Sequence, residues 1–154
     1  MNGAGVLVVG YGNPLRGDDG FGCAAARLLA ADPRLEAATV LTLHQLTPEL
    51  ATDIASASLV VLVDAGVVDG APGSVAVRSI QPRQDSPLPW SHHLDPAALA
   101  GLAHALYDHV PPIVLISVAG AAFAHGDRLS PALQRVLPEV VDKVARVVEE
   151  HADG

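Results

Sequence analysis

The apolar residues of this chain fall into short uninterrupted runs that alternate with longer amphipathic segments. The runs at 6–9, 59–63 and 113–118 are rich in valine, isoleucine and leucine, a pattern typical of strands buried on both faces of a parallel sheet. A further strand is predicted at 39–43. Apolar and polar residues alternate at 74–78, which predicts a half-exposed edge strand whose orientation, parallel or antiparallel, is open.

Helical spacing predicts four helices between and after these strands. Residues 21–29 place apolar side chains three and four positions apart. Thr47 and Asp95 each precede a proline, as a capping residue does at the start of a helix. The final helix, 130–148, carries a continuous apolar stripe, and Pro138 is expected to kink or restart it.

The order of these elements predicts an α/β fold. Strands that alternate with helices form a doubly wound, mostly parallel sheet with helices on both faces. We therefore expect a single domain, residues 1–154, built as a three-layer α/β/α sandwich around a twisted sheet of about five strands. The carboxyl ends of the inner strands of such a sheet meet at one edge, where ligands bind.

Composition narrows the classes of function. The net charge of -8 and the pI near 5.1 argue against sequence-independent binding to nucleic acid. The one cysteine, Cys23, permits neither an internal disulfide nor a thiolate metal site within the chain. No apolar run has the length of a signal peptide core or a membrane span. We therefore expect a cytoplasmic protein that does not bind membranes.

The loop between the first strand and the first helix, residues 10–22, is rich in glycine and holds two adjacent acids. Its glycines after Gly12 are spaced too widely for the G-x-G-x-x-G fingerprint of dinucleotide-binding proteins. Asp18 and Asp19 would also repel a phosphate at the helix N-terminus. We expect instead that one acid caps the helix and that the other is free for chemistry.

A third acid, Asp64, directly follows the buried strand 59–63. Asp19 follows the first strand, so both carboxylates are expected at the carboxyl edge of the sheet. Acids at such positions also serve as caps and turn residues, and that interpretation is open for Asp18, Asp19 and Asp64.

The segment 10–22, G-Y-G-N-P-L-R-G-D-D-G-F-G, resembles the N-terminal signature of the hydrogenase maturation endopeptidases. These enzymes trim a C-terminal extension from the nickel-containing large subunit of [NiFe] hydrogenases. The resemblance implies that Asp19, the second acid of the loop, reads the nickel. It also assigns two further residues to the same site, Asp64 and His93. Asp64 lies in a V-D-A context, and His93 follows a serine shortly before a predicted helix.

Carried over residue by residue, the resemblance makes Asp19, Asp64 and His93 both the metal-binding and the catalytic set. Two carboxylates and one imidazole leave coordination positions open on a divalent ion such as nickel or zinc. The resemblance implies that nickel arrives in the large-subunit precursor and serves as the recognition element, and that another divalent metal can occupy the site in vitro. It implies a protein that acts as a monomer.

The chain departs from this family at two points. The family often has an acidic, glycine-rich segment after the second strand, where this chain has His44-Gln45-Leu46-Thr47-Pro48. The first metal acid of relatives is frequently glutamate, which is longer than Asp19 by one methylene. His44 and His92 are open either as residues that assist the metal site or as solvent-exposed polar residues.

Other functions use the same residues. A non-catalytic nickel-binding protein that docks on the precursor needs the same ligands, and a small-molecule α/β enzyme is a third class. A serine or cysteine nucleophile is not expected, because the chain lacks a G-x-S-x-G elbow and Cys23 lies within the first predicted helix. The proline-containing segment 81–90 is expected to grip the precursor, with Trp90 either as its anchor or as part of the core.

Overall fold

A computed structural model describes residues 5–66, 70–83, 94–121 and 126–153. Five strands and four α-helices follow one another in this part of the chain, with two short 3-10 helices, η1 and η2. In chain order the elements are β1 (Val6–Tyr11), η1 (Gly17–Gly20), α1 (Phe21–Ala30), η2 (Pro33–Leu35), β2 (Thr39–Leu43), α2 (Leu50–Ser56), β3 (Leu59–Gly66), β4 (Val75–Ser79), α3 (Pro96–Tyr107), β5 (Ile113–Ala119) and α4 (Pro131–Asp153).

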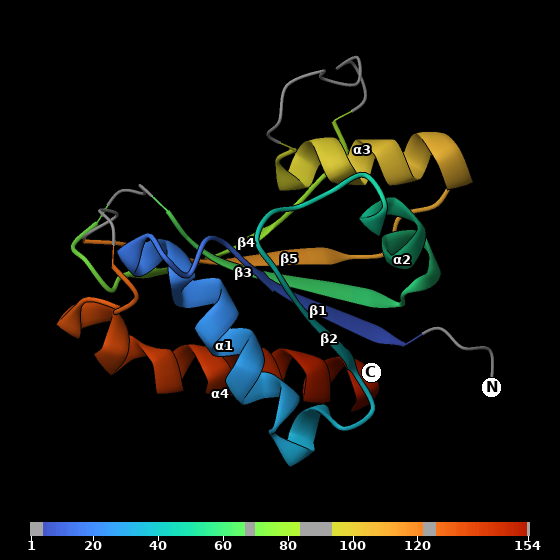
Figure 1. Cartoon of the computed structure of the whole chain (residues 1–154). Coiled ribbons are helices and arrows are strands. Elements are labelled where there is room, and N and C mark those ends of the chain that lie inside the picture. Colours follow the sequence, from blue (N-terminus) through green and yellow to red (C-terminus); the bar gives the residue numbers. More distant parts are fainter. Residues whose placement is uncertain (1–4, 67–69, 84–93, 122–125, 154) are drawn as a thin grey trace.

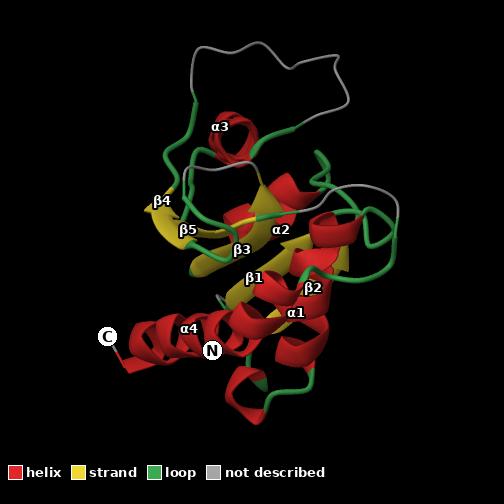
Figure 2. Cartoon of the chain, turned by 90° about the vertical axis from the view of Figure 1, so that its left-hand side faces the viewer, coloured by secondary structure: helices red, strands yellow, loops and turns green. Residues whose placement is uncertain are grey.

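The strands form one sheet in the order β2-β1-β3-β5-β4. The pairs β1·β2, β1·β3 and β3·β5 are parallel, and only the edge strand β4 pairs antiparallel with β5. Helices α2 and α3 cover one face, and α1 and α4 cover the other (Figures 1 and 2). The predicted α/β fold, with its mostly parallel five-stranded sheet between two helical layers, is confirmed.

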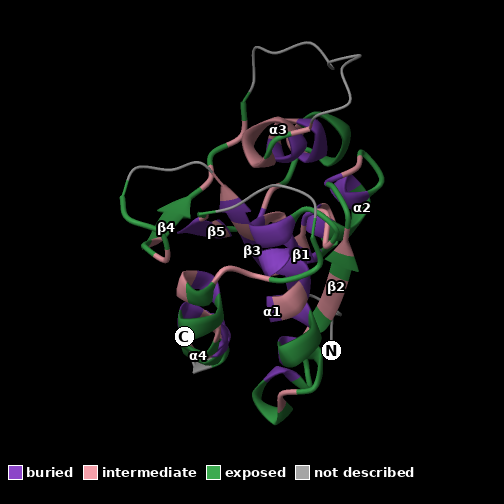
Figure 3. Ribbon diagram, turned by 60° about the vertical axis from the view of Figure 1, so that its left-hand side comes forward, coloured by how far each residue is buried: buried purple, intermediate pink, exposed green. Residues whose placement is uncertain are grey.

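Alternate residues of the inner strands supply two separate cores. On β3, Val61 and Val63 pack with α1 and α4, whereas Val60 and Leu62 pack with α2 and α3. Both sets are almost fully buried, and the inner strands lie in the purple centre of Figure 3. Strands buried on both faces explain why β1, β3 and β5 read as continuous apolar runs.

The first turn of α1 lies directly against the carboxyl ends of β1 and β3. A side-chain carbon added at Gly22 would stand 2.5 Å from the carbonyl oxygens of both Tyr11 and Val63, and one added at Gly10 would stand 2.0 Å from the Gly22 carbonyl oxygen. Only glycine permits this approach at either position. The contact brings the loop that precedes α1 to the carboxyl edge of the sheet.

Three local expectations differ from the structure. The sequence predicted a helix that starts directly after Thr47, but helix α2 begins at Leu50. A turn with hydrogen bonds from Leu50 N to Thr47 O and from Ala51 N to Pro48 O precedes it. Helix α4 runs through Pro138 without a restart, since its apolar stripe packs along the sheet on both sides of that residue. The cap of α1 is Gly20, which offers no side-chain cap.

The Asp95 cap of α3 is confirmed, with a bond of 2.8 Å from the Ala98 N–H.

Among the described residues, no helix is both long enough and apolar enough to span a bilayer.

The contact of α1 with the strand ends can be tested with Gly22→Ala. The new methyl group would overlap the Tyr11 and Val63 carbonyls, so we expect the free energy of unfolding to fall by about 1–3 kcal/mol in urea denaturation. Gly66→Ala is the matched control, because a side-chain carbon there meets no atom within 4 Å. An equal effect of the two substitutions would contradict the close contact.

Candidate functional site

A cleft of about 760 Å³ opens at the carboxyl edge of the sheet. The connection after β1 leads to β2 on one side of the sheet, and the connection after β3 leads to β4 and β5 on the other side. The direction of the chain across the sheet therefore switches between β1 and β3. Doubly wound sheets bind ligands at this switch point. The cleft is lined by the ends of β1 and β3, the loops after β1 and β2, and the start of α3: Tyr11, Gly12, Asn13, Arg16, Asp19, His44, Gln45, Leu46, Asp64, Leu94, Asp95 and Pro96.

Asp19 lies in η1 and is half-buried at one side of this cleft. Its Oδ2 atom accepts a hydrogen bond of 2.8 Å from the Asn13 N–H. Gly12, at φ +138°, packs so closely that an added side-chain carbon would stand 2.0 Å from the Asp19 carbonyl oxygen. The loop is therefore folded tightly around Asp19, and the expectation that one acid of the pair is available to a ligand fits this position.

Asp18 has a structural role rather than the expected role of a helix cap. Its side chain is fully buried and accepts bonds from the Ala121 N–H at 2.7 Å, the Ser130 N–H at 2.7 Å and the Ser130 hydroxyl at 2.9 Å. Gly17 and Gly126 add a bond of 2.8 Å from N to O between the same two loops. Asp18 thus ties the loop after β1 to the segment that follows β5.

Asp64 lies on β3, lines the same cleft and is half-buried. The hydroxyl groups of Tyr11 and Ser117 act on its carboxylate and favour its charged form. Burial raises the pKa of Asp64 above its ordinary value, and the Asp19 charge adds to this rise. The Tyr11 and Ser117 hydroxyl groups and the charge of Arg78 lower the pKa of Asp64 without cancelling the rise. Asp19 and Asp64 are thus close enough for their charges to interact.

Tyr11 shares the environment of Asp64. Burial, followed by the neighbouring Asp64 carboxylate, raises the pKa of Tyr11 well above its ordinary value. The Tyr11 hydroxyl therefore stays protonated and remains a hydrogen-bond donor throughout the range in which proteins function.

The third expected ligand, His93, lies outside the described residues, as do His92 and Trp90. Within the described ranges, no three histidine, cysteine or acidic side chains come together as a metal site. The structure brings Asp19 and Asp64 together at one cleft, which His44 also lines, and His44 is exposed to solvent. His93 remains a prediction, as does the role of the segment 81–90.

Cys23 is buried in the first turn of α1 and does not have the environment of a nucleophile. Its Sγ donates to the carbonyl oxygens of Gly12 at 3.3 Å and Leu43 at 3.5 Å. Burial, with the Asp19 charge, raises the pKa of the thiol, and Arg27 only partly opposes this. A buried protonated thiol is chemically inert, which agrees with the expectation from the sequence.

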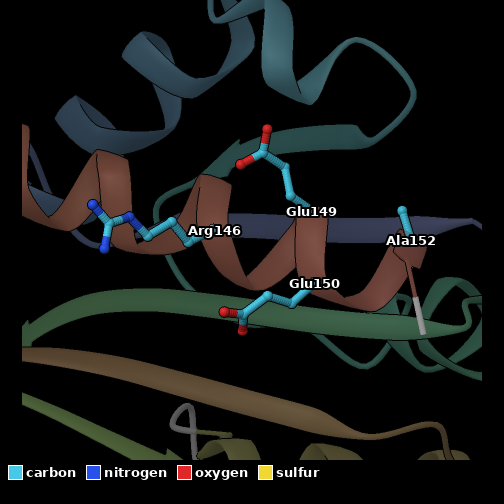
Figure 4. A pocket seen from close by; sticks show the side chains of 4 residues that line it. All are labelled: Arg146, Glu149, Glu150 and Ala152. Carbon is cyan, nitrogen blue, oxygen red and sulfur yellow. The ribbon is translucent and has the colours of Figure 1, made fainter.

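A second hollow of about 470 Å³ lies along the C-terminal part of α4, lined by Arg146, Glu149, Glu150 and Ala152. The charged side chains there point away from one another (Figure 4), and all four residues are exposed. No set of groups converges on a ligand at this surface, so the cleft at the carboxyl edge is the candidate site.

Sequence reasoning missed Tyr11 and Ser117 as neighbours of Asp64. Ser117 is a buried polar residue in an otherwise apolar strand, which is a usable signal because buried polar groups need partners. Its partner could not be identified without the register, which sets Ser117 opposite Asp64.

Solved structures with the same fold were compared with the chain. The [NiFe] hydrogenase maturation protease HycI from Thermococcus kodakarensis superimposes with a TM-score of 0.73 at 22% identity, covering 95% of this chain and 93% of that one. The hydrogenase 2 maturation peptidase from a Thaumarchaeota archaeon gives 0.73 at 24% identity, with coverage of 94% and 98%. The hydrogenase maturating endopeptidase HybD from E. coli gives 0.72 at 19% identity, with coverage of 96% and 93%.

No protein-family model and no curated protein matches the chain in sequence. The solved structures show that the chain has the fold of the hydrogenase maturation proteases over nearly its whole length. The fold implied by the loop 10–22 is therefore confirmed.

Asp18→Asn and Asp19→Asn separate the roles of the two adjacent acids. The amide of the Asp18 variant would face donors that now bind a carboxylate, so we expect a loss of about 1–3 kcal/mol in the free energy of unfolding. Asp19→Asn keeps an oxygen for the Asn13 N–H, and a smaller change is expected. Urea denaturation measures both, and equal losses would contradict the assignment.

The raised pKa of Asp64 predicts how stability depends on pH. The folded-state pKa of Asp64 lies above the ordinary value of 3.8, so protonated Asp64 stabilises the folded state. This contribution to stability is complete below pH 3.8 and is lost as the pH rises through the folded-state pKa. Asp64→Asn removes this loss, so the free energy of unfolding of the variant should rise relative to wild type between acid and neutral pH.

Asp32→Asn is the control with the opposite sign. Hydrogen bonds from the Arg34 side chain and backbone lower the pKa of Asp32, so this variant should lose stability relative to wild type over the same rise in pH. Denaturation midpoints across the pH series measure both differences. Parallel curves for wild type and Asp64→Asn would contradict the effect of burial on Asp64.

Proposed function

We propose that this chain is a metal-dependent endopeptidase that removes the C-terminal extension of a [NiFe] hydrogenase large-subunit precursor. In this proposal the nickel already inserted in the precursor is part of the substrate and serves as the recognition element. The protein acts as a cytoplasmic monomer.

One observation carries the proposal. Asp19 and Asp64, far apart in the sequence, line the same cleft at the switch point of the sheet and interact through their charges. The loop that holds Asp19 has the sequence that resembles the maturation endopeptidases, and the fold of the whole chain matches structures of such proteases.

The donor set suits a divalent metal. Two carboxylates that repel each other in a half-buried cleft gain stability when a cation lies between them. Carboxylate oxygens together with an imidazole are accepted by nickel and zinc. We propose His93 as the imidazole, because it shortly precedes Asp95, the cap of α3, and Pro96, its first residue, which both line the cleft.

The proposed reaction is hydrolysis of one peptide bond. Water adds its hydroxyl to the carbonyl carbon, the bond from carbon to nitrogen breaks, and the leaving amine takes up a proton. A carboxylate of the cleft accepts the proton of the attacking water, and the nickel of the substrate polarises the carbonyl or the water. The raised pKa of Asp64 brings its proton affinity closer to that needed of a general base.

Mass spectrometry of a nickel-loaded precursor incubated with the purified protein tests the proposal. Wild type should shorten the precursor, whereas Asp64→Asn and His93→Ala should slow cleavage by about 10²–10⁴-fold, because each loses a group that touches the metal or the reacting atoms. Asp53→Asn is the control, since Asp53 is an exposed acid on α2 and should leave the rate unchanged.

The outcomes separate the alternatives. A stable complex with an intact precursor would contradict cleavage and support a docking protein that inspects the nickel site. Equal cleavage of nickel-loaded and nickel-free precursor would contradict recognition through nickel. Normal cleavage by both variants would show that Asp64 and His93 are not the ligands.

A further inference from the structure

Three polar side chains form a row across neighbouring strands at the cleft. The register sets Asp64 of β3 opposite Ser117 of β5, and Tyr11 of β1 follows the paired residues Gly10 and Val63. The preceding residues on the same face of these strands are apolar and pack against α2 and α3: Leu7, Val9, Val60, Leu62, Ile113 and Leu115. Tyr11, Asp64 and Ser117 are therefore the first polar residues on this face toward the carboxyl edge of the sheet.

The two hydroxyl groups of this row flank the carboxylate. Tyr11 and Ser117 stand beside Asp64, one on each neighbouring strand, and both hydroxyl groups favour its charged form. Ser117 is only 5% exposed, and Tyr11 is half-buried at the cleft wall. A carboxylate has about four lone-pair positions, so hydrogen bonds from two such hydroxyl groups would orient the side chain and leave acceptor capacity for a ligand.

We propose that Tyr11 and Ser117 are positioning residues that hold the Asp64 carboxylate in one orientation toward the cleft. This inference rests on the proposed role of Asp64 at the metal-reading site. Donors behind a ligating carboxylate orient it and raise metal affinity, because the side chain loses little freedom when the metal binds.

The neighbouring groups do not replace these donors. Arg78 of β4 pairs with Leu115 in the register, two pairs away from Ser117, and it acts on Asp64 through its charge. Asp19 acts on Asp64 through repulsion. Neither interaction sets the orientation of the side chain, which requires directional hydrogen bonds.

The orientation of Asp64 can be measured directly in the metal-free protein. Three-bond NMR couplings to the side-chain carboxyl carbon report the χ1 rotamer of Asp64. We expect a single rotamer in wild type and an average over rotamers in Tyr11→Phe/Ser117→Ala. The single variants give the same comparison if the double variant does not fold. One unchanged rotamer in the variants that lack the hydroxyls would overturn the proposal.

Matched controls come from hydroxyl groups away from the row. Tyr107→Phe removes the other tyrosine hydroxyl of the chain, which lies 2.7 Å from Thr52 Oγ1, and Ser56→Ala removes a hydroxyl that donates to Thr52 O at 3.0 Å. Both controls should keep the Asp64 rotamer of wild type. Averaging in the controls as well would overturn the assignment to Tyr11 and Ser117.

Calorimetric titration with Ni²⁺ measures the effect of the two hydroxyl groups on metal affinity. Loss of both should weaken Ni²⁺ binding by about 10–100-fold, and the controls should bind as wild type does. Equal affinity in all variants would contradict the inference. Neither measurement uses a precursor. A wild-type protein that fails to cleave therefore contradicts the proposed function alone, whereas an Asp64 that keeps its rotamer contradicts the positioning role alone.

Discussion

The site depends on one backbone contact, the approach of the first turn of α1 to the carboxyl ends of β1 and β3. Gly10 and Gly22 make it possible, because a side-chain carbon at either position would overlap a carbonyl oxygen. The contact forces the chain between β1 and α1 to turn within residues 12–20. Asp19 is carried on that turn to the switch point of the sheet, where Asp64 lies near the end of the neighbouring strand.

A hydrogen-bonded network holds the loop that carries Asp19. Asp18 fixes the loop after β1 to Ala121 and Ser130, whereas Tyr11 and Ser117 stand beside Asp64 on the neighbouring strands. Adjacent acids in the sequence thus have separate roles, one structural and one facing the cleft. Two repelling carboxylates in a half-buried cleft are unfavourable without a cation, which fits the proposal that this site meets its metal on the substrate.

The sequence predicted what local pattern determines. Continuous apolar runs identified β1, β3 and β5, and a capping residue followed by proline identified the start of α3. The role of Asp18 could not be predicted, because its partners lie 103 and 112 residues away. The Asp64 neighbours depend on strand register, which the pattern of one strand does not specify. The placement of Asp19 and Asp64 was predictable because topology alone brings those strand ends together.

The central claim is that Asp19 and Asp64 bind the nickel carried by the precursor. Nickel K-edge X-ray absorption on precursor mixed with this protein and frozen before cleavage tests it most directly. We predict additional oxygen or nitrogen ligands on nickel compared with the precursor alone, and no such ligands with the Asp19→Asn/Asp64→Asn variant. An identical nickel spectrum with and without the wild-type protein, in a sample where the two proteins are bound, would contradict the claim.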